Sequence, residues 1–117
     1  MQNVKIWHNP RCSKSRNTAA LLEEKGVDAE VVKYLETPPS KAEIKEVLKM
    51  LGIGARELMR TKEDIYKTLD LKNENDEEKL IEAMAENPKL IERPIVIKNG
   101  KAAIGRPIEN IVALLDA

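Results

Sequence analysis

The chain has 117 residues, enough for one folded domain with its own hydrophobic core. Its 20 basic and 20 acidic residues cancel, so overall charge gives no reason to expect binding to nucleic acid or to a membrane. The single cysteine excludes an internal disulfide and suits a reducing compartment. No stretch approaches the roughly 20 apolar residues of a membrane span, and residues 1–5 lack the apolar run of a signal peptide. We therefore expect a cytoplasmic protein.

The first third of the chain predicts a strand, a helix and a second strand. Residues 4–7 are rich in strand formers, and the Asn-Pro pair at residues 9–10 ends the run because proline biases the preceding residue toward extended geometry. A helix is expected from about residues 13–15 to Gly26, a favourable C-terminal cap. Residues 30–35 predict the second strand. The residues expected to face the core from the helix are Thr18, Leu21 and Leu22.

A helical block follows. Ser40 and Glu43 form a capping-box pattern, in which each side chain bonds the other residue's backbone N–H. Behind the box, apolar residues at amphipathic helical spacing predict a core-facing stripe of Ile44, Val47, Leu48 and Leu51. Gly52 and Gly54 interrupt this helix. Further helical segments are expected at residues 55–60, 65–69 and 76–86.

The last quarter predicts two short strands and a helix. The strands cover residues 94–98 and 101–104, around an Asn99–Gly100 pair typical of a type I′ turn. The helix carries its apolar residues at core-facing spacing: Ile108, Ile111, Val112 and Leu115. The full order is β-α-β, a helical block, then β-β-α. It predicts an α/β, thioredoxin-like fold, a single domain over residues 1–117 with a helical insertion at roughly residues 40–88.

Cys12 lies between the first strand and the first helix. A thiol is nucleophilic only as its thiolate, and the pKa of a free cysteine is about 8.5. The unpaired N–H groups and partial positive charge of a helix N-terminus favour that anion, and Arg11, Lys14 and Arg16 add cations nearby in sequence. Lowering the pKa by about two units takes roughly 2.7 kcal/mol. The alternative is an inert buried cysteine, but polar loop neighbours do not make an apolar pocket, so the pattern favours a nucleophile.

Cys12 and Ser15 form a monothiol version of the Cys-x-x-Cys redox motif. Ser15 cannot form a disulfide, so an external thiol such as glutathione has to release an oxidised or adducted Cys12. Two roles remain possible for His8 and two for Ser15. His8 acts as a base or orients the loop, or it is a hydrogen-bonded histidine at a strand end. Ser15 donates a hydrogen bond to the thiolate, or it caps the helix.

At this loop the sequence resembles the glutaredoxin-coupled arsenate reductases of the ArsC family, in particular its small bacterial members. A nucleophile loop followed by three arginine motifs is a specific pattern, whereas Cys-x-x-Ser alone is not. The departures at the loop are Arg11, Ser13 and Lys14, which can change substrate access or choice. The match extends along nearly the whole chain, through His8-Asn9-Pro10, Cys12, Ser15-Arg16-Asn17-Thr18, residues 34–40, 56–60, Asn87-Pro88, residues 92–96 and Gly105-Arg106-Pro107.

The resemblance implies an arginine trio around the cysteine, at Arg60, Arg93 and Arg106. Guanidinium groups stay charged and present paired donors to an oxyanion. The resemblance further implies a cis peptide before Pro94, which is chemically compatible because cis bonds are mostly restricted to proline. Arg56, one helical turn from Arg60, is a competing candidate.

The implied activity is reduction of arsenate to arsenite through a covalent arsenic–sulfur adduct on Cys12. Glutathione serves as co-substrate and a glutaredoxin as partner, with no bound cofactor and no metal, since one histidine and one cysteine are too few for a structural zinc site. Two alternatives remain. One is a glutathione-dependent thiol reductase of another substrate. The other is a relative of Spx, a regulator that binds RNA polymerase, although Spx usually has the second cysteine that Ser15 replaces.

Overall fold

The computed structural model describes residues 4–116. Residues 1–3, which contribute to the expected absence of a signal peptide, and residue 117 lie outside the described part. The chain divides into two compact units: Met1–Thr37 with Arg93–Ala117, here called the sheet unit, and Pro38–Glu92, here called the helical unit. The single domain over the whole chain stays a prediction.

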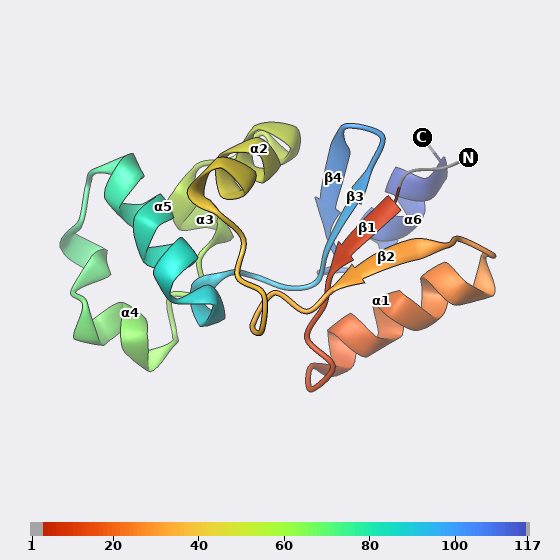
Figure 1. The fold of residues 1–117 in the computed structure, drawn as a ribbon, viewed down its shortest axis with the longest axis horizontal. Coiled ribbons are helices and arrows are strands. Elements are labelled where there is room, and N and C mark those ends of the chain that lie inside the picture. The colour runs from red at the N-terminus through yellow and green to blue at the C-terminus, as the bar shows by residue number, and fades with distance from the viewer. Residues whose placement is uncertain (1–3, 117) are drawn as a thin grey trace. The chain divides into compact units, whose positions relative to one another are not determined.

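The sheet unit contains a mixed four-stranded sheet in the order β2-β1-β3-β4 (Figure 1). β1 is central, parallel to β2 and antiparallel to β3, and β4 pairs antiparallel with β3. The element order β-α-β and then β-β-α is that of the predicted thioredoxin-like fold. The bounds are β1 Val4–Trp7, α1 Ser13–Glu24, β2 Ala29–Val32, β3 Ile95–Lys98, β4 Lys101–Ile104 and α6 Glu109–Asp116.

The core of this unit forms because apolar residues at strand and helix spacing meet on one face of the sheet. Alternate residues of β1 enter this cluster, as expected for a strand. Buried Lys98 donates from Nζ to the carbonyl of Leu115 at 2.8 Å, which ties β3 to α6. The buried cluster consists of Val4, Ile6, Leu22, Val96, Ile111 and Leu114.

The predicted end of the second strand is wrong, and the core residues of the last helix differ in part from those predicted. The second strand begins at Ala29 and ends at Val32, because the backbone then turns: the N–H groups of Glu36 and Thr37 both donate to the Lys33 carbonyl at 2.9 Å. Tyr34 is fully buried within that turn, and its apolar character extended the strand pattern. In the last helix, Leu114 enters the core, whereas the predicted Leu115 is only partly buried against it.

The predicted hairpin turn is confirmed. Asn99 and Gly100 join β3 to β4 with φ angles of 48° and 81°. A type I′ turn requires positive φ at both central positions, and these are the residue types that tolerate it.

The helical unit contains four helices and two short 3-10 turns. The predicted capping box is confirmed: Glu43 N–H donates to Ser40 Oγ at 3.1 Å, and Ser40 N–H donates to Glu43 Oε1 at 3.0 Å. Gly52 ends α2 in the left-handed conformation, with φ of 69°. The bounds are α2 Lys41–Leu51, α3 Ala55–Leu58, α4 Asp64–Thr68, η1 Leu71–Asn73, α5 Glu77–Glu86 and η2 Pro88–Leu90.

Ser40→Ala should destabilise the protein by about 1 kcal/mol, because it removes the side-chain acceptor that caps the first turn of α2. Urea unfolding followed by circular dichroism measures the loss, with Thr61→Ala, an exposed hydroxyl residue outside the helices, as the control. Equal stabilities of the Ser40→Ala and Thr61→Ala proteins would contradict this role of the box.

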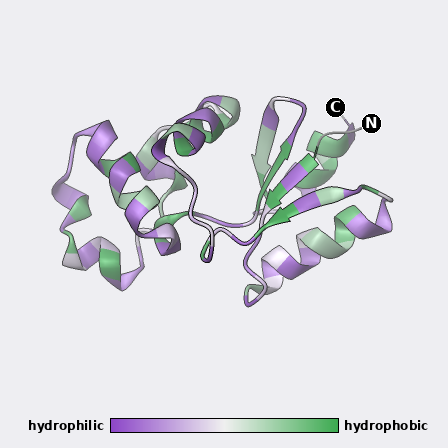
Figure 2. Ribbon diagram, viewed as in Figure 1, coloured by the Kyte–Doolittle hydropathy of each residue, from purple (hydrophilic) through white to green (hydrophobic). Residues whose placement is uncertain are grey.

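Apolar and polar residues alternate along the helices in Figure 2, as the amphipathic spacing predicts. Among the described residues, no helix combines the length and the apolar character needed to cross a membrane.

Candidate active site

Cys12 lies at the N-cap position of α1 and is half-buried. Buried Asn9 shapes the loop before it: the Asn9 carbonyl accepts from Cys12 N–H, and Asn9 Oδ1 accepts from Arg11 N–H, both at 3.0 Å. Arg16 reaches back from α1 and donates to the carbonyl of Pro10 at 3.0 Å. The loop therefore holds the thiol at the start of the helix. Asn9 was not singled out from the sequence, although asparagine commonly organises turns through its side chain.

The surroundings of Cys12 favour its thiolate. Burial is the largest single influence and raises the pKa of the thiol. The opposing influences together outweigh it: hydrogen bonds from the Ser15 backbone, the Arg93 side chain and the Lys14 backbone, and the positive charge of Arg93. The net pKa of Cys12 is therefore lowered, as expected for a cysteine at a helix N-terminus beside a cation.

Two of the three predicted arginines meet at this cysteine. Arg106 Nη2 lies 3.3 Å from Cys12 Sγ, and Arg106 Nε donates to the Arg93 carbonyl at 2.7 Å. The guanidinium of Arg106 thus spans the backbone of Arg93 and the sulfur of Cys12. The peptide bonds Arg93–Pro94 and Arg106–Pro107 are both cis. The second of these was not anticipated from the sequence.

His8 and Ser15 form a hydrogen-bonded pair that joins the two ends of the Cys12 loop. His8 Nδ1 lies 2.6 Å from Ser15 Oγ, which also accepts from Asn9 N–H at 3.0 Å. Ser15 is fully buried, so its hydroxyl holds the loop, while its backbone N–H hydrogen-bonds Cys12. Burial, followed by the charges of Lys33 and Arg16, lowers the pKa of His8. The neutral ring is therefore favoured, and a role for His8 as a base stays a prediction.

Gly105 allows a close approach that no pattern in the sequence predicts. Its N–H donates to the Pro94 carbonyl at 2.9 Å. A Cβ atom at this position would lie 2.7 Å from Pro94 Cγ and 2.8 Å from Thr18 Oγ1, closer than side chains pack. Only glycine lets the chain pass over Pro94 and deliver Arg106 to Cys12. The Gly-Arg-Pro sequence was the available signal, but it does not specify the contact.

Arg60 belongs to the helical unit. Its N–H donates to the Leu90 carbonyl at 2.7 Å, and its Nη1 contacts Glu92 Oε1 at 2.9 Å. Its role in binding an oxyanion stays a prediction.

Arg56, the competing candidate, serves the internal structure of the helical unit. Its guanidinium donates to Tyr66 Oη at 2.5 Å, to the Leu71 carbonyl at 2.9 Å and to the Glu74 carbonyl. These three partners lie in α4, in η1 and directly after η1, so they hold the Arg56 side chain within the helical unit.

No group of three or more metal-ligating His, Cys, Asp or Glu side chains occurs among residues 4–116. The expectation that the protein works without a metal stays a prediction.

Cys12 should react with iodoacetamide at pH 7 faster than free cysteine does. Because its pKa is lowered, a larger fraction is thiolate at neutral pH, and the rate should fall only when the pH drops below that lowered pKa. Alkylation rates measured from pH 4 to 10 give the pKa. A midpoint at or above about 8.5, the value of free cysteine, would contradict the assignment.

The sheet unit has a thioredoxin-like fold, with a half-buried cysteine at the start of its first helix and an arginine in contact with the sulfur. These features place the protein in the class of thioredoxin-fold proteins that carry a thiol at this position. The sequence model of the ArsC family matches residues 7–114, and the chain belongs to that family.

Three relatives show how far the similarity extends. The chain is 57% identical over 117 residues to a protein of Neisseria meningitidis named arsenate reductase, covering 98% of this chain and all of the relative. A solved structure titled putative arsenate reductase from Yersinia pestis has 58% identity and a TM-score of 0.91, covering 95% of this chain and 99% of that one. An arsenate reductase structure from Vibrio cholerae has 51% identity and a TM-score of 0.92, and the match covers 96% of this chain and 97% of that one.

Proposed function

We propose that this protein reduces arsenate to arsenite in the cytoplasm, with Cys12 as its single nucleophile and with glutathione and a glutaredoxin supplying the electrons. The observation that carries the proposal is the sulfur of Cys12 at the N-terminus of α1, 3.3 Å from Arg106 Nη2. The names of the similar proteins support arsenate as the substrate.

In the first step, the Cys12 thiolate attacks arsenic. A sulfur–arsenic bond forms, an arsenic–oxygen bond breaks, and the departing oxygen takes up protons and leaves as water. Arsenic remains pentavalent. Arg93 and Arg106 bind the remaining oxygens and stabilise the negative charge that gathers on them during attack. Arg60 is proposed as the third oxyanion-binding arginine, on the family resemblance alone.

In the second step, a glutathione thiolate attacks the sulfur of Cys12. A disulfide forms between the two sulfurs, the sulfur–arsenic bond breaks, and its electron pair passes to arsenic, which leaves as trivalent arsenite. Each sulfur is oxidised by one electron, which balances the two-electron reduction. A glutaredoxin thiolate then attacks the glutathione sulfur and releases Cys12. This step requires an external thiol because the chain has no second cysteine.

The test is arsenate-dependent oxidation of NADPH, coupled through glutathione reductase with glutathione and a glutaredoxin supplied. Turnover that requires arsenate, glutathione and glutaredoxin supports the proposal. Oxidation without arsenate but with a glutathionylated substrate would replace it with the glutathione-dependent thiol reductase. Capture of RNA polymerase by a folded protein that turns over neither substrate would favour the Spx-like alternative.

A further inference from the structure

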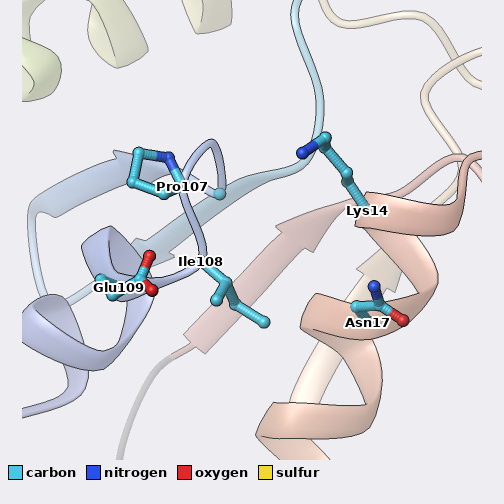
Figure 3. A pocket seen from close by; sticks show the side chains of 6 residues that line it. Lys14, Asn17, Pro107, Ile108 and Glu109 are labelled. Atoms are coloured by element: carbon cyan, nitrogen blue, oxygen red, sulfur yellow. The ribbon is translucent and has the colours of Figure 1, made fainter.

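A cavity of about 240 Å³ lies between α1 and the connection from β4 to α6 (Figure 3). We call it the α1–α6 pocket. Its lining lies close to Cys12 along the chain: Lys14 follows Cys12 by two residues, and Gly105 directly precedes Arg106, whose Nη2 lies 3.3 Å from the Cys12 sulfur. The residues that line it, all in the sheet unit, are Lys14, Asn17, Gly105, Pro107, Ile108 and Glu109.

The pocket combines one cation and one anion. Lys14, on the α1 wall, and Glu109, on the α6 wall, are exposed, and neither forms an ion pair within residues 4–116 (Figure 3). Asn17 adds an amide, while Pro107 and Ile108 give an apolar surface. A simple oxyanion gains from Lys14 but is repelled by Glu109. A group that carries both a carboxylate and an ammonium matches both charges.

We propose that the α1–α6 pocket binds the γ-glutamyl head group of glutathione, with the α-carboxylate at Lys14 and the α-ammonium at Glu109. This inference rests on the proposed function, in which glutathione attacks the Cys12 sulfur. Sites that bury a whole drug-sized ligand usually measure about 300–1,000 Å³. A pocket of about 240 Å³ therefore suits one arm of the tripeptide, leaving its cysteinyl sulfur outside, next to Cys12.

A second cavity, of about 230 Å³, is the rival location for the thiol. It is lined by the loop before Cys12 and by the turn after β2, and its charged residues are Arg11, Lys33 and Glu36, with His8 beside them. The excess of positive charge suits an anion better than a zwitterion. Lys33→Gln is therefore the variant that tests this rival.

The experiment is thiol–disulfide exchange without arsenate, so it reports on thiol recognition whether or not the protein reduces arsenate. The Cys12 thiolate attacks one sulfur of glutathione disulfide. A mixed disulfide forms, the original disulfide bond breaks, and one glutathione thiolate leaves. Intact-mass spectrometry follows the modified fraction over time. The reaction is repeated with bis(2-hydroxyethyl) disulfide, which has no charges. For each variant, the rate with glutathione disulfide is divided by this reference rate, which removes changes in the reactivity of Cys12 itself.

Glu109→Gln should lower the normalised rate with glutathione disulfide by about two- to fivefold, the upper part of the range for one exposed charged contact. Lys14→Gln should lower it by a similar factor. Glu24→Gln, an exposed glutamate at the far end of α1, is the matched control and should leave it unchanged. A disulfide of glutathione that lacks the α-amino groups should react slowly with the wild type and should not slow further in Glu109→Gln.

The direction of the Glu109→Gln effect is decisive. Glutathione disulfide carries a net negative charge, so attraction that depends only on overall charge predicts a faster reaction when Glu109 is neutralised. A faster or unchanged normalised rate would overturn the proposal. So would a loss confined to Lys33→Gln, which would place the thiol in the rival cavity.

Discussion

Replacing Cys12 by serine should abolish arsenate reduction, with a fall of about 10⁴-fold or more in kcat, as is typical when an enzyme loses its nucleophile. A serine hydroxyl is neither deprotonated nor comparably nucleophilic near pH 7. It also cannot form the disulfide through which electrons reach arsenic. The hydrogen bonds that favour a thiolate at this position cannot restore either property. The measurement is the coupled NADPH assay at saturating arsenate and glutathione.

The serine variant should keep the fold, because Cys12 is half-buried at the start of a helix and serine is a good N-cap residue. Circular dichroism and thermal unfolding check this directly. Turnover within tenfold of the wild type in a folded Cys12→Ser protein would end the proposed mechanism. It would also remove the reason to regard the loop at residues 8–16 as the active site.

Replacing Arg106 by alanine should lower kcat/KM for arsenate by about 10²–10³-fold, the usual cost of removing a donor that stabilises charge in the transition state. The variant loses the 3.3 Å contact to the Cys12 sulfur and the 2.7 Å bond to the Arg93 carbonyl. Two effects should therefore appear together. Arsenate turnover falls, and the pKa of Cys12 rises because a nearby cation is gone.

Arg106→Lys separates charge from geometry. Lysine keeps the charge but lacks the planar fork that spans the Arg93 carbonyl and the Cys12 sulfur. We expect it to recover part of the thiolate stabilisation and little of the turnover. Arg11→Ala, an exposed arginine of the same loop, is the matched control. Equal losses in Arg11→Ala and Arg106→Ala would show that general positive charge matters, and not this contact.

Local patterns in the sequence were sufficient for much of the fold. Ser40 with Glu43, and Asn99 with Gly100, predict their structures because a capping box and a type I′ turn are set by residues a few positions apart. The end of β2 was missed for the opposite reason. Tyr34 is buried through tertiary packing in a turn, and a run of apolar residues cannot distinguish that from a strand.

The sequence predicts which residue types form the candidate site, but it does not predict how their side chains are arranged. Cys12 could be chosen because a polar loop before a helix is a poor place for an inert cysteine. The contact between Cys12 and Arg106 joins residues that are 94 positions apart, and no local pattern specifies such a contact. The same holds for Gly105 against Pro94, which is visible only once the two segments are placed together. The hydrogen bonds of the Asn9 side chain and the contact between Ser15 and His8 depend on side-chain directions, which sequence spacing does not give.

The most direct test of the central claim is a single turnover followed by mass spectrometry of the protein. Wild-type protein is mixed with arsenate and one equivalent of glutathione, without glutaredoxin, and the product is digested and mapped. Glutathione alone cannot oxidise Cys12, so the proposed chemistry predicts a glutathione mixed disulfide on Cys12 only when arsenate is present, with one arsenite formed per modified chain. Arsenite formed while Cys12 remains unmodified, or modification of Cys12 to the same extent without arsenate, would contradict the mechanism.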